Sequence, residues 1–335
     1  MDIRRSERLA LLPRSASRSM RAVVYDDCGA PDVLRVAGVP LPEPAAGQVR
    51  VRVRAAGVQH MDLAQRGGWF GGGRDDALPF PRRIGSEFAG RIDMAGPGVY
   101  GLAVGDDVLG WCERGAYADA VCVPASQCVA RPPLLDWAAA AALPDAGQSA
   151  HVALACLRLQ RGETLLIHGA AGGVGSMAVQ LARLAGVRVV GTAREANHAY
   201  LHALGAEPVA YGPGLASRVR ALAPHGVDAA LDAAGSEAAL RASLALVAEP
   251  ARIGSLVRKA DAEAAGAQAI RVRRSRTALL ELVDLCARGL LHVHLRAVFP
   301  MVQAAAAHRL LARGHGCGRV ALWMAPEARS AARAP

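Results

Sequence analysis

The stretch Gly-Ala-Ala-Gly-Gly-Val-Gly at residues 169–175 decides the fold of this chain. An apolar run typical of a buried strand precedes it at 164–168, and a helical pattern with one apolar face follows it at 175–185. Glycines between a strand and a helix permit a tight turn and let a phosphate approach the backbone, where the N–H groups of the helix start bind it. The sequence therefore predicts a dinucleotide-binding loop in which the cofactor is contacted by Gly172, Gly173, Val174 and Gly175.

The same alternation of strand and helix continues on the C-terminal side of this loop. Further strands are expected at 188–192, 227–232 and 251–254, with helices at 199–204 and 278–287. Repeated strand–helix units of this kind indicate a doubly wound parallel sheet. Two later glycines, Gly235 and Gly254, are also predicted to contact the cofactor.

The first third of the chain is predicted to form an antiparallel, barrel-like β domain. Valines alternate with arginines over 49–54, which is the period of a half-buried strand, and other short strand candidates are separated by turn residues. We expect the following division: a disordered extension or upstream start at 1–19, a β domain at 20–146, a nucleotide-binding domain at 147–285, and a return to the first domain at 286–335. The glycine-rich stretch 67–76 is predicted to be a mobile loop near the mouth of the cleft.

The end of the second strand of the nucleotide-binding domain indicates which nicotinamide cofactor is used. An acidic residue there would bind the ribose 2′-hydroxyl of NAD, but this strand ends in Thr192 and is followed by Arg194. Arginine suits a 2′-phosphate because its guanidinium forms bidentate, charge-assisted hydrogen bonds. We therefore predict NADPH (NADP+), with Thr192 and Arg194 at its adenosine end; Glu195 is the ribose ligand in the alternative NAD reading.

Composition limits the class of protein further. The 335 residues suggest two domains, and 52% hydrophobic residues supply sizeable cores. The net charge is +10, but Lys259 is the only lysine and the arginines are scattered, so we attribute the charge to composition bias and expect no nucleic-acid partner. No apolar stretch is long enough to span a membrane. Seven cysteines without a C-x-x-C pair favour a reduced, cytoplasmic protein without a secretory signal.

Several motifs in one order resemble the zinc-independent, quinone oxidoreductase-like branch of the medium-chain dehydrogenase/reductase superfamily. They cover nearly the whole chain from Met20 to Trp323, and they are the segments 21–25, 29–34, 51–57, 105–108, 170–175, 226–232 and 318–322. The resemblance implies a GroES-like β domain, an inserted Rossmann domain and an active site in the cleft between them. It also implies a homodimer, and it places Tyr211 beside Arg194 at the cofactor.

Zinc alcohol dehydrogenases share this architecture, so the resemblance also locates their metal ligands. The three ligand positions correspond to Gln59, Ser86 and Asp145, of which only the aspartate is a good zinc ligand. Catalytic zinc needs three protein ligands and an open position, so we predict no metal site. His60 and Glu87 are conceivable replacement ligands, although a single histidine beside an active-site loop is more often a packing or substrate-contact residue.

The resemblance implies hydride transfer from NADPH to a quinone or to the β-carbon of an α,β-unsaturated carbonyl. Gln59 would donate a hydrogen bond to the substrate oxygen and His60 would supply a proton, and the alternative is that both only line the cleft. Two tyrosines that some relatives carry correspond to Ala64 and Phe70 here, which departs from a standard quinone site.

Three other functions stay open at this point. One is a biosynthetic enoyl reductase acting on a polyketide-like small-molecule substrate. Another is an NADPH-binding redox sensor or non-catalytic protein, which the missing tyrosines and the charge of Asp145 favour. A DNA-binding role has the least support, and it would require DNA affinity that depends steeply on salt.

Overall fold

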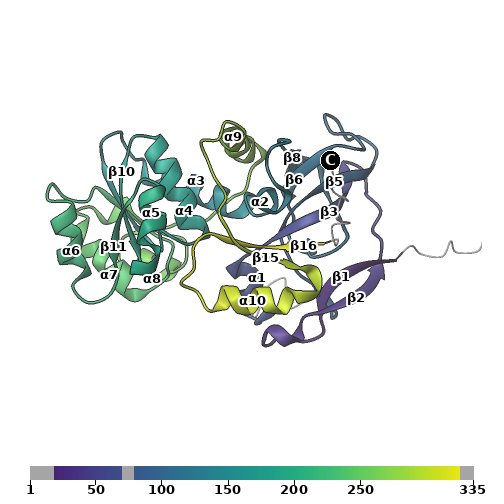
Figure 1. Ribbon diagram of the computed structural model, residues 1–335, viewed down its shortest axis with the longest axis horizontal. Coiled ribbons are helices and arrows are strands. Elements are labelled where there is room, and N and C mark those ends of the chain that lie inside the picture. Colours follow the sequence, from purple (N-terminus) through teal and green to yellow (C-terminus); the bar gives the residue numbers. More distant parts are fainter. Residues whose placement is uncertain (1–18, 70–78, 325–335) are drawn as a thin grey trace, which may run out of the picture.

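The computed structural model describes residues 19–69 and 79–324. Two sheet-built units lie side by side along the longest axis of the molecule (Figure 1). The expected N-terminal extension, except Ser19, lies outside the described residues, as do Phe70, most of the expected loop 67–76 and the tail 325–335.

A six-stranded parallel sheet forms the nucleotide-binding unit, as the strand–helix alternation predicted. Its strand order is β11-β10-β9-β12-β13-β14, so the order reverses at β9, where ligands bind in folds of this kind. The strands are β9 (Thr164–His168), β10 (Arg188–Ala193), β11 (Glu207–Ala210), β12 (Ala229–Asp232), β13 (Ile253–Ser255) and β14 (Gln268–Ala269). The helices around them are α4 (Gly173–Leu184), α5 (His198–Ala203), α6 (Leu215–Leu222), α7 (Glu237–Leu246) and α8 (Lys259–Ala264).

The second unit is built from a seven-stranded and a three-stranded sheet and has the predicted barrel-like β character. The larger sheet has the order β15-β16-β3-β5-β6-β8, with β7 also paired to β3, and the smaller has the order β2-β1-β4. The strands are β1 (Ser19–Tyr25), β2 (Arg35–Pro40), β3 (Gln48–Val58), β4 (Arg82–Arg83), β5 (Glu87–Ala95), β6 (Asp107–Trp111), β7 (Ala120–Pro124), β8 (Cys128–Ala130), β15 (Leu295–Pro300) and β16 (Arg319–Trp323).

The alternation of valine and arginine in β3 has the predicted inward and outward faces, with one exception. Val49, Val51 and Val53 are buried, but Arg50 is also buried, at 5% exposure. Its guanidinium forms an ion pair with Asp93, at 2.7 Å from Nε to Oδ1, which compensates for the loss of water around the charge.

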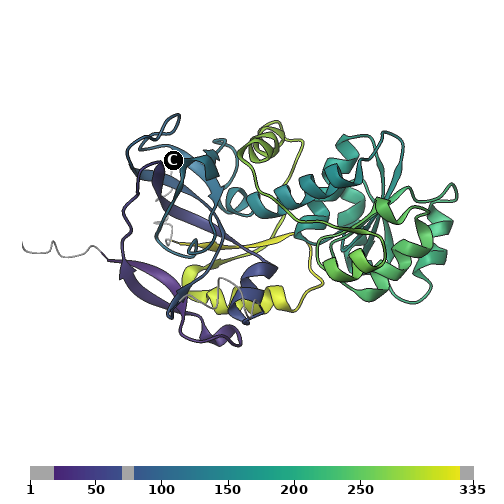
Figure 2. The same cartoon turned by 180° about the vertical axis from the view of Figure 1, so that it is seen from behind.

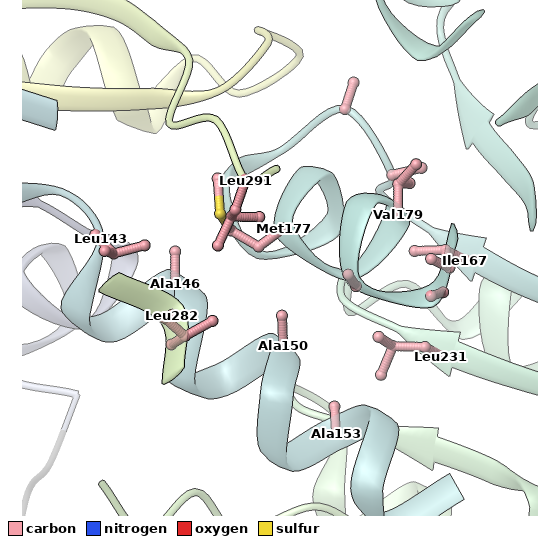
Figure 3. Packing of buried hydrophobic residues seen from close by; sticks show 14 of the residues in the cluster. Leu143, Ala146, Ala150, Ala153, Ile167, Met177, Val179, Leu231, Leu282 and Leu291 are labelled. Atoms are coloured by element: carbon pink, nitrogen blue, oxygen red, sulfur yellow. The ribbon is translucent and has the colours of Figure 1, made fainter. Parts of the chain in front are cut away.

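Two helices join the units. The unit-spanning helices are α3 (Pro144–Leu157) and α9 (Arg276–Ala287), and α3 packs against α4. Figure 3 shows the small side chains of Ala146, Ala150 and Ala153 on one side of α3, near Leu282 and Met177. The boundaries expected at 146/147 and 285/286 therefore fall inside helices rather than between elements.

The remaining helices are short and belong to the β unit. They are α1 (His60–Arg66), α2 (Trp137–Ala141) and α10 (Ala304–Ala312). Short 3₁₀ turns occur in both units, at Pro31–Val33, Ala125–Gln127, Glu195–Asn197, Pro250–Arg252 and Met301–Gln303. The longest helix in the described part of the chain has 14 residues, and no helix there is long and apolar enough to cross a bilayer.

Candidate active site

A pocket of about 620 Å³ lies where the two units meet. The glycine loop and the C-terminal ends of β9 and β10 line it from the nucleotide-binding unit, while His60 and residues 314–316 and 318–320 line it from the β unit. Figure 2 shows this C-terminal chain passing between the units on its way into β16. The predicted position of a cofactor between two domains thus coincides with a real cavity.

The glycine loop is shaped to receive a phosphate. Gly172 is the N-cap of α4, and its N–H donates to the carbonyl of Gly169 at 3.0 Å. The N–H groups of the first turn have no partner within the helix, so they are available to a ligand. A Cβ on Gly175 would collide with the carbonyl oxygen of Gly169, whereas a Cβ on Gly172 would be 3.3 Å from that oxygen. Gly175 therefore lets helix and strand pack together, and Gly172 leaves a cradle that a side chain would fill.

The structure brings seven of the nine predicted cofactor residues to this pocket. These are Gly172, Gly173, Val174, Gly175, Thr192, Arg194 and Tyr211. Gly235 lies between Ala234 and Ser236, which line the pocket, and has a φ of +74°. Gly254 does not line the pocket, since it lies in β13, where its missing side chain makes room for Ile270.

The predicted arginine and tyrosine line the pocket in contact with each other. Arg194 Nε donates to the hydroxyl of Tyr211 at 2.8 Å. Thr192 is buried, and its Oγ1 accepts a hydrogen bond from the N–H of Gly169 at 3.3 Å, so it holds the glycine loop against β10. Glu195 is exposed and does not line the pocket, which favours Arg194 over Glu195 as the group that meets the ribose.

The three positions of the zinc ligands meet in space but form a hydrogen-bonded cluster of a different kind. The Gln59 side chain contacts both the hydroxyl of Ser86 and the carboxylate of Asp145, and all partners are satisfied when its amide donates to Asp145 and accepts from Ser86. Gln59 is buried, at 4% exposure. Its amide is thus engaged within the protein. Within 19–69 and 79–324, no three metal-ligating side chains of the His, Cys, Asp and Glu types are grouped to hold a metal ion.

A buried ion pair beside this cluster links the β unit to the glycine loop. Arg319 contacts Glu87, whose other oxygen accepts from the backbone N–H of Asp145 at 2.8 Å. The stem of Arg319 occupies the space that a Cβ on Gly173 would need. Burial raises the pKa of Glu87, and the positive charge of Arg319 opposes that rise. Sequence reasoning missed Arg319, although it lies within the motif at 318–322.

Asp62 fixes the segment that carries Gln59 and His60. Its Oδ2 accepts from the hydroxyl of Tyr117 at 2.8 Å and from the backbone N–H of Gln59 at 3.0 Å, which caps α1. In the part of the chain that the structure describes, no donor reaches its Oδ1. Complete burial, with a smaller contribution from Asp145, raises the pKa of Asp62 to about 7.

His60 is the predicted catalytic residue that faces the pocket. It is the first residue of α1, and its side chain is open to the cavity. The surrounding protein and the charge of Arg319 lower the pKa of His60. The imidazole is therefore neutral at pH 7, where it donates a hydrogen bond through its N–H more readily than it releases a proton as an acid. The catalytic roles of Gln59 and His60 stay predictions.

A pocket lined by a glycine loop, where a parallel sheet meets a barrel-like β unit, defines the class of two-domain, nicotinamide-dependent oxidoreductases. Residues 45–133 match the family "Alcohol dehydrogenase GroES-like domain", and residues 204–322 match the family "Zinc-binding dehydrogenase". The chain belongs to the quinone oxidoreductase-like branch of the medium-chain dehydrogenase/reductase superfamily.

Solved structures of similar chains support this assignment. The quinone oxidoreductase from Coxiella burnetii is 28% identical, with a TM-score of 0.81 over 92% of this chain and 100% of that one. Mycobacterial Rv1454c, solved as a complex with NADPH, is 29% identical, with a TM-score of 0.80 over 91% of this chain and 100% of that one. An NAD-dependent alcohol dehydrogenase is 30% identical, with a TM-score of 0.80 over the same shares of the two chains.

Curated relatives include large polyketide synthases. Erythronolide synthase EryA2 of Saccharopolyspora erythraea is 44% identical over 163 residues, which is 48% of this chain and 4% of that protein. The chain spans only 3% to 14% of the first polyketide synthases that it matches.

Proposed function

We propose that this oxidoreductase uses NADPH, works without zinc, and transfers hydride to a quinone or to an α,β-unsaturated carbonyl. The observation that carries the proposal is the pocket itself. The glycine loop, the contacting pair Arg194 and Tyr211, and His60 from the β unit all line it. The small-molecule substrate would therefore bind on the His60 side of the pocket.

The residues present fit a dinucleotide with a 2′-phosphate. The space above Gly172 suits a pyrophosphate, and Arg194 suits a third phosphate group. The nicotinamide, when bound, supplies the hydride. The protein's own contribution is to hold the acceptor beside that ring and to stabilise the negative charge that develops on its oxygen. His60 lines the pocket, which supports a role for its side chain as the hydrogen-bond donor to that oxygen.

Independence from zinc is supported by the bonding of the former ligand positions. Gln59 and Ser86 carry neutral amide and hydroxyl groups, the Gln59 side chain binds both Ser86 and Asp145, and none of the three residues is a thiolate or imidazole. We also propose that the protein is a homodimer. We further propose a cytoplasmic location, since the seven free cysteines suit a reducing setting.

A second candidate is the reduction of an enoyl thioester in a polyketide-like pathway. The 44% identity to part of erythronolide synthase EryA2 favours it. It uses the same cofactor and the same polarisation of a carbonyl oxygen, so the two candidates differ only in the group attached to the carbonyl.

The test is the loss of NADPH absorbance with a panel of a quinone, a simple enone, a 2-enoyl thioester and a simple aldehyde, repeated after treatment with a zinc chelator. We expect turnover of the quinone, the enone or the thioester, none with the aldehyde, and no effect of the chelator. Preference for the thioester would select the second candidate. Binding of NADPH with no turnover of any acceptor would refute both and favour a redox sensor, while loss of activity with the chelator would refute zinc independence.

A further inference from the structure

The segment 270–275 joins β14 to α9 and passes beside the first half of α3. We call it the basic linker, because three of its six residues are arginines. Hydrogen bonds fix both of its ends. The N–H of Ile270 donates to the carbonyl of Ser255 at 2.9 Å. The N–H of Ser275 donates to the side-chain oxygen of Gln148, a buried residue of α3, at 2.7 Å. The backbone of the linker is therefore held against α3.

One arginine of the basic linker differs from the other two in its surroundings. Arg271 and Arg273 are exposed, and Arg271 pairs with Glu263 on the surface. Arg274 is partly buried, and its Nη1 lies 3.8 Å from Oδ1 of Asp145, which is an ion pair but too long for a hydrogen bond. Nη1 has no hydrogen-bond partner within residues 19–69 and 79–324. The Arg274 guanidinium thus lies beside Asp145 with donor capacity to spare.

Asp145 and Arg274 form the accessible edge of the cluster that surrounds Gln59. Gln59 and Ser86 are buried, and Glu87, which accepts from the N–H of Asp145, is fully buried. The side chains of Asp145 and Arg274 are in contrast 26% and 28% exposed. A small molecule that approaches the cluster would therefore meet these two charged groups before any of the others.

The same cluster adjoins the candidate cofactor pocket at two points. His60 lines the pocket and directly follows Gln59 in the chain. Arg319 also lines the pocket, and its ion pair with Glu87 extends from the pocket wall into the cluster. The basic linker thus brings a further positive charge, that of Arg274, to a group of residues that borders the pocket.

We propose that Arg274 is a catalytic residue, whose guanidinium donates a hydrogen bond to the carbonyl oxygen of the hydride acceptor. Asp145 and Gln59 are positioning residues in this scheme, because Asp145 holds the guanidinium and the Gln59 amide holds Asp145. The inference rests on the proposed function and names a group that stabilises the charge on the acceptor oxygen. It also gives a role to the charge of Asp145, at a position that corresponds to a zinc ligand in the alcohol dehydrogenases.

The electron balance of the reaction shows what this arginine contributes. With an enone, hydride adds to the β-carbon, the electrons of the carbon–carbon double bond move toward the carbonyl, and the oxygen takes the negative charge of an enolate. Arginine keeps its proton at any ordinary pH, so Arg274 stabilises the enolate as a cation, and the proton on the α-carbon of the product comes from water. A carbonyl oxygen has two lone pairs, so it can accept from Arg274 and from His60 together.

The test compares kcat and KM of the wild type, Arg274→Ala and Arg274→Gln, with the acceptor of the panel that the wild type reduces fastest. Loss of one donor to a developing oxyanion predicts that kcat of Arg274→Ala falls about 100-fold or more. Arg274→Gln keeps a planar N–H donor without the charge, so its kcat should lie between the two. The matched control is Arg271→Ala, which removes an exposed arginine of the same linker and should leave kcat unchanged.

Two readouts separate catalysis by Arg274 from a structural role. The dissociation constant of NADPH, measured without acceptor, should be the same in Arg274→Ala as in the wild type. Guanidinium ion at a non-denaturing concentration should restore part of the rate of Arg274→Ala and none of the rate of Asp145→Asn, which still has its arginine. An ion pair that is a quarter exposed adds little to stability, so both variants should fold.

The outcomes distinguish this inference from the proposed function. If the wild type reduces neither the quinone, the enone nor the enoyl thioester, the proposed function fails. If the wild type reduces one of them and either Arg274 variant keeps the wild-type kcat, the role of Arg274 alone is refuted. Loss of NADPH binding together with activity in Arg274→Ala would refute it as well, and an unchanged kcat in Asp145→Asn would refute the positioning role of Asp145.

Discussion

Replacing Asp62 with asparagine should remove a large part of the pH dependence of stability of the β unit. The folded-state pKa of about 7 lies some 3 units above the ordinary value of 3.8, because burial disfavours the charged carboxylate. The folded state therefore holds a proton that the unfolded state releases. Its stabilising effect is fully present below about pH 4, is lost as the pH rises to about 7, and changes little above that.

The size of the effect follows from the shift. One pKa unit corresponds to about 1.4 kcal/mol, so Asp62 lowers the free energy of unfolding by about 4 kcal/mol at pH 8 relative to pH 4. Asparagine keeps an oxygen to accept from Tyr117 and from the backbone N–H of Gln59, and its NH₂ takes the place of the protonated Oδ1. Asp62→Asn should therefore match the wild type near pH 4 and exceed it at pH 8.

The assay is urea unfolding followed by tryptophan fluorescence. It reports on the β unit, because Trp69, Trp111, Trp137 and Trp323 all lie outside the parallel sheet. Tyr117→Phe removes a hydrogen-bond donor to the Asp62 carboxylate, so it should raise the pKa of Asp62. The fall in stability with rising pH should then continue to a higher pH. Parallel pH profiles for the wild type and Asp62→Asn would refute the reasoning.

Two further predictions concern the loop and the ion pair. Gly172→Ala should weaken NADPH binding about tenfold or more with little loss of stability, since its Cβ fits in the absence of cofactor. Gly175→Ala should instead lower the free energy of unfolding by about 1–3 kcal/mol, because its Cβ collides with the carbonyl oxygen of Gly169. Unaltered NADPH affinity in Gly172→Ala would remove the loop from the site. Arg319→Met should lower the free energy of unfolding by about 3–5 kcal/mol by leaving Glu87 buried and unpaired, and adding Glu87→Leu should recover most of that loss. A double variant as unstable as the single one would contradict this account.

Local patterns in the sequence predicted most of the framework. The strand β9 has the expected bounds, and α4 begins two residues earlier than its predicted apolar face. The sequence pattern does not predict β11 or α6, because β11 has four residues and α6 buries only Leu215 and Val219. Such elements are determined by packing against their neighbours rather than by their own pattern.

The site was predictable where it depends on neighbours in sequence and unpredictable where it depends on neighbours in space. The glycine loop and Arg194 follow from a strand–turn–helix pattern. The hydrogen bonds of Gln59 depend on Asp145, and the pair of Glu87 and Arg319 joins residues 232 positions apart. No periodicity connects such positions, so only the folded chain brings them together.

The position of β16 within the large sheet has a consequence for biosynthesis. Its pairing of Val320 with Val58 and of Trp323 with Ala55 joins residues more than 260 positions apart in the chain. The parallel sheet, by contrast, closes entirely within residues 164–269. On a ribosome the nucleotide-binding unit is therefore free to fold while the β unit still lacks two strands, β15 and β16. During that interval residues 55–58 of β3 lack their partner strand β16, so the nascent chain is most exposed to aggregation or chaperone binding before residue 323 emerges.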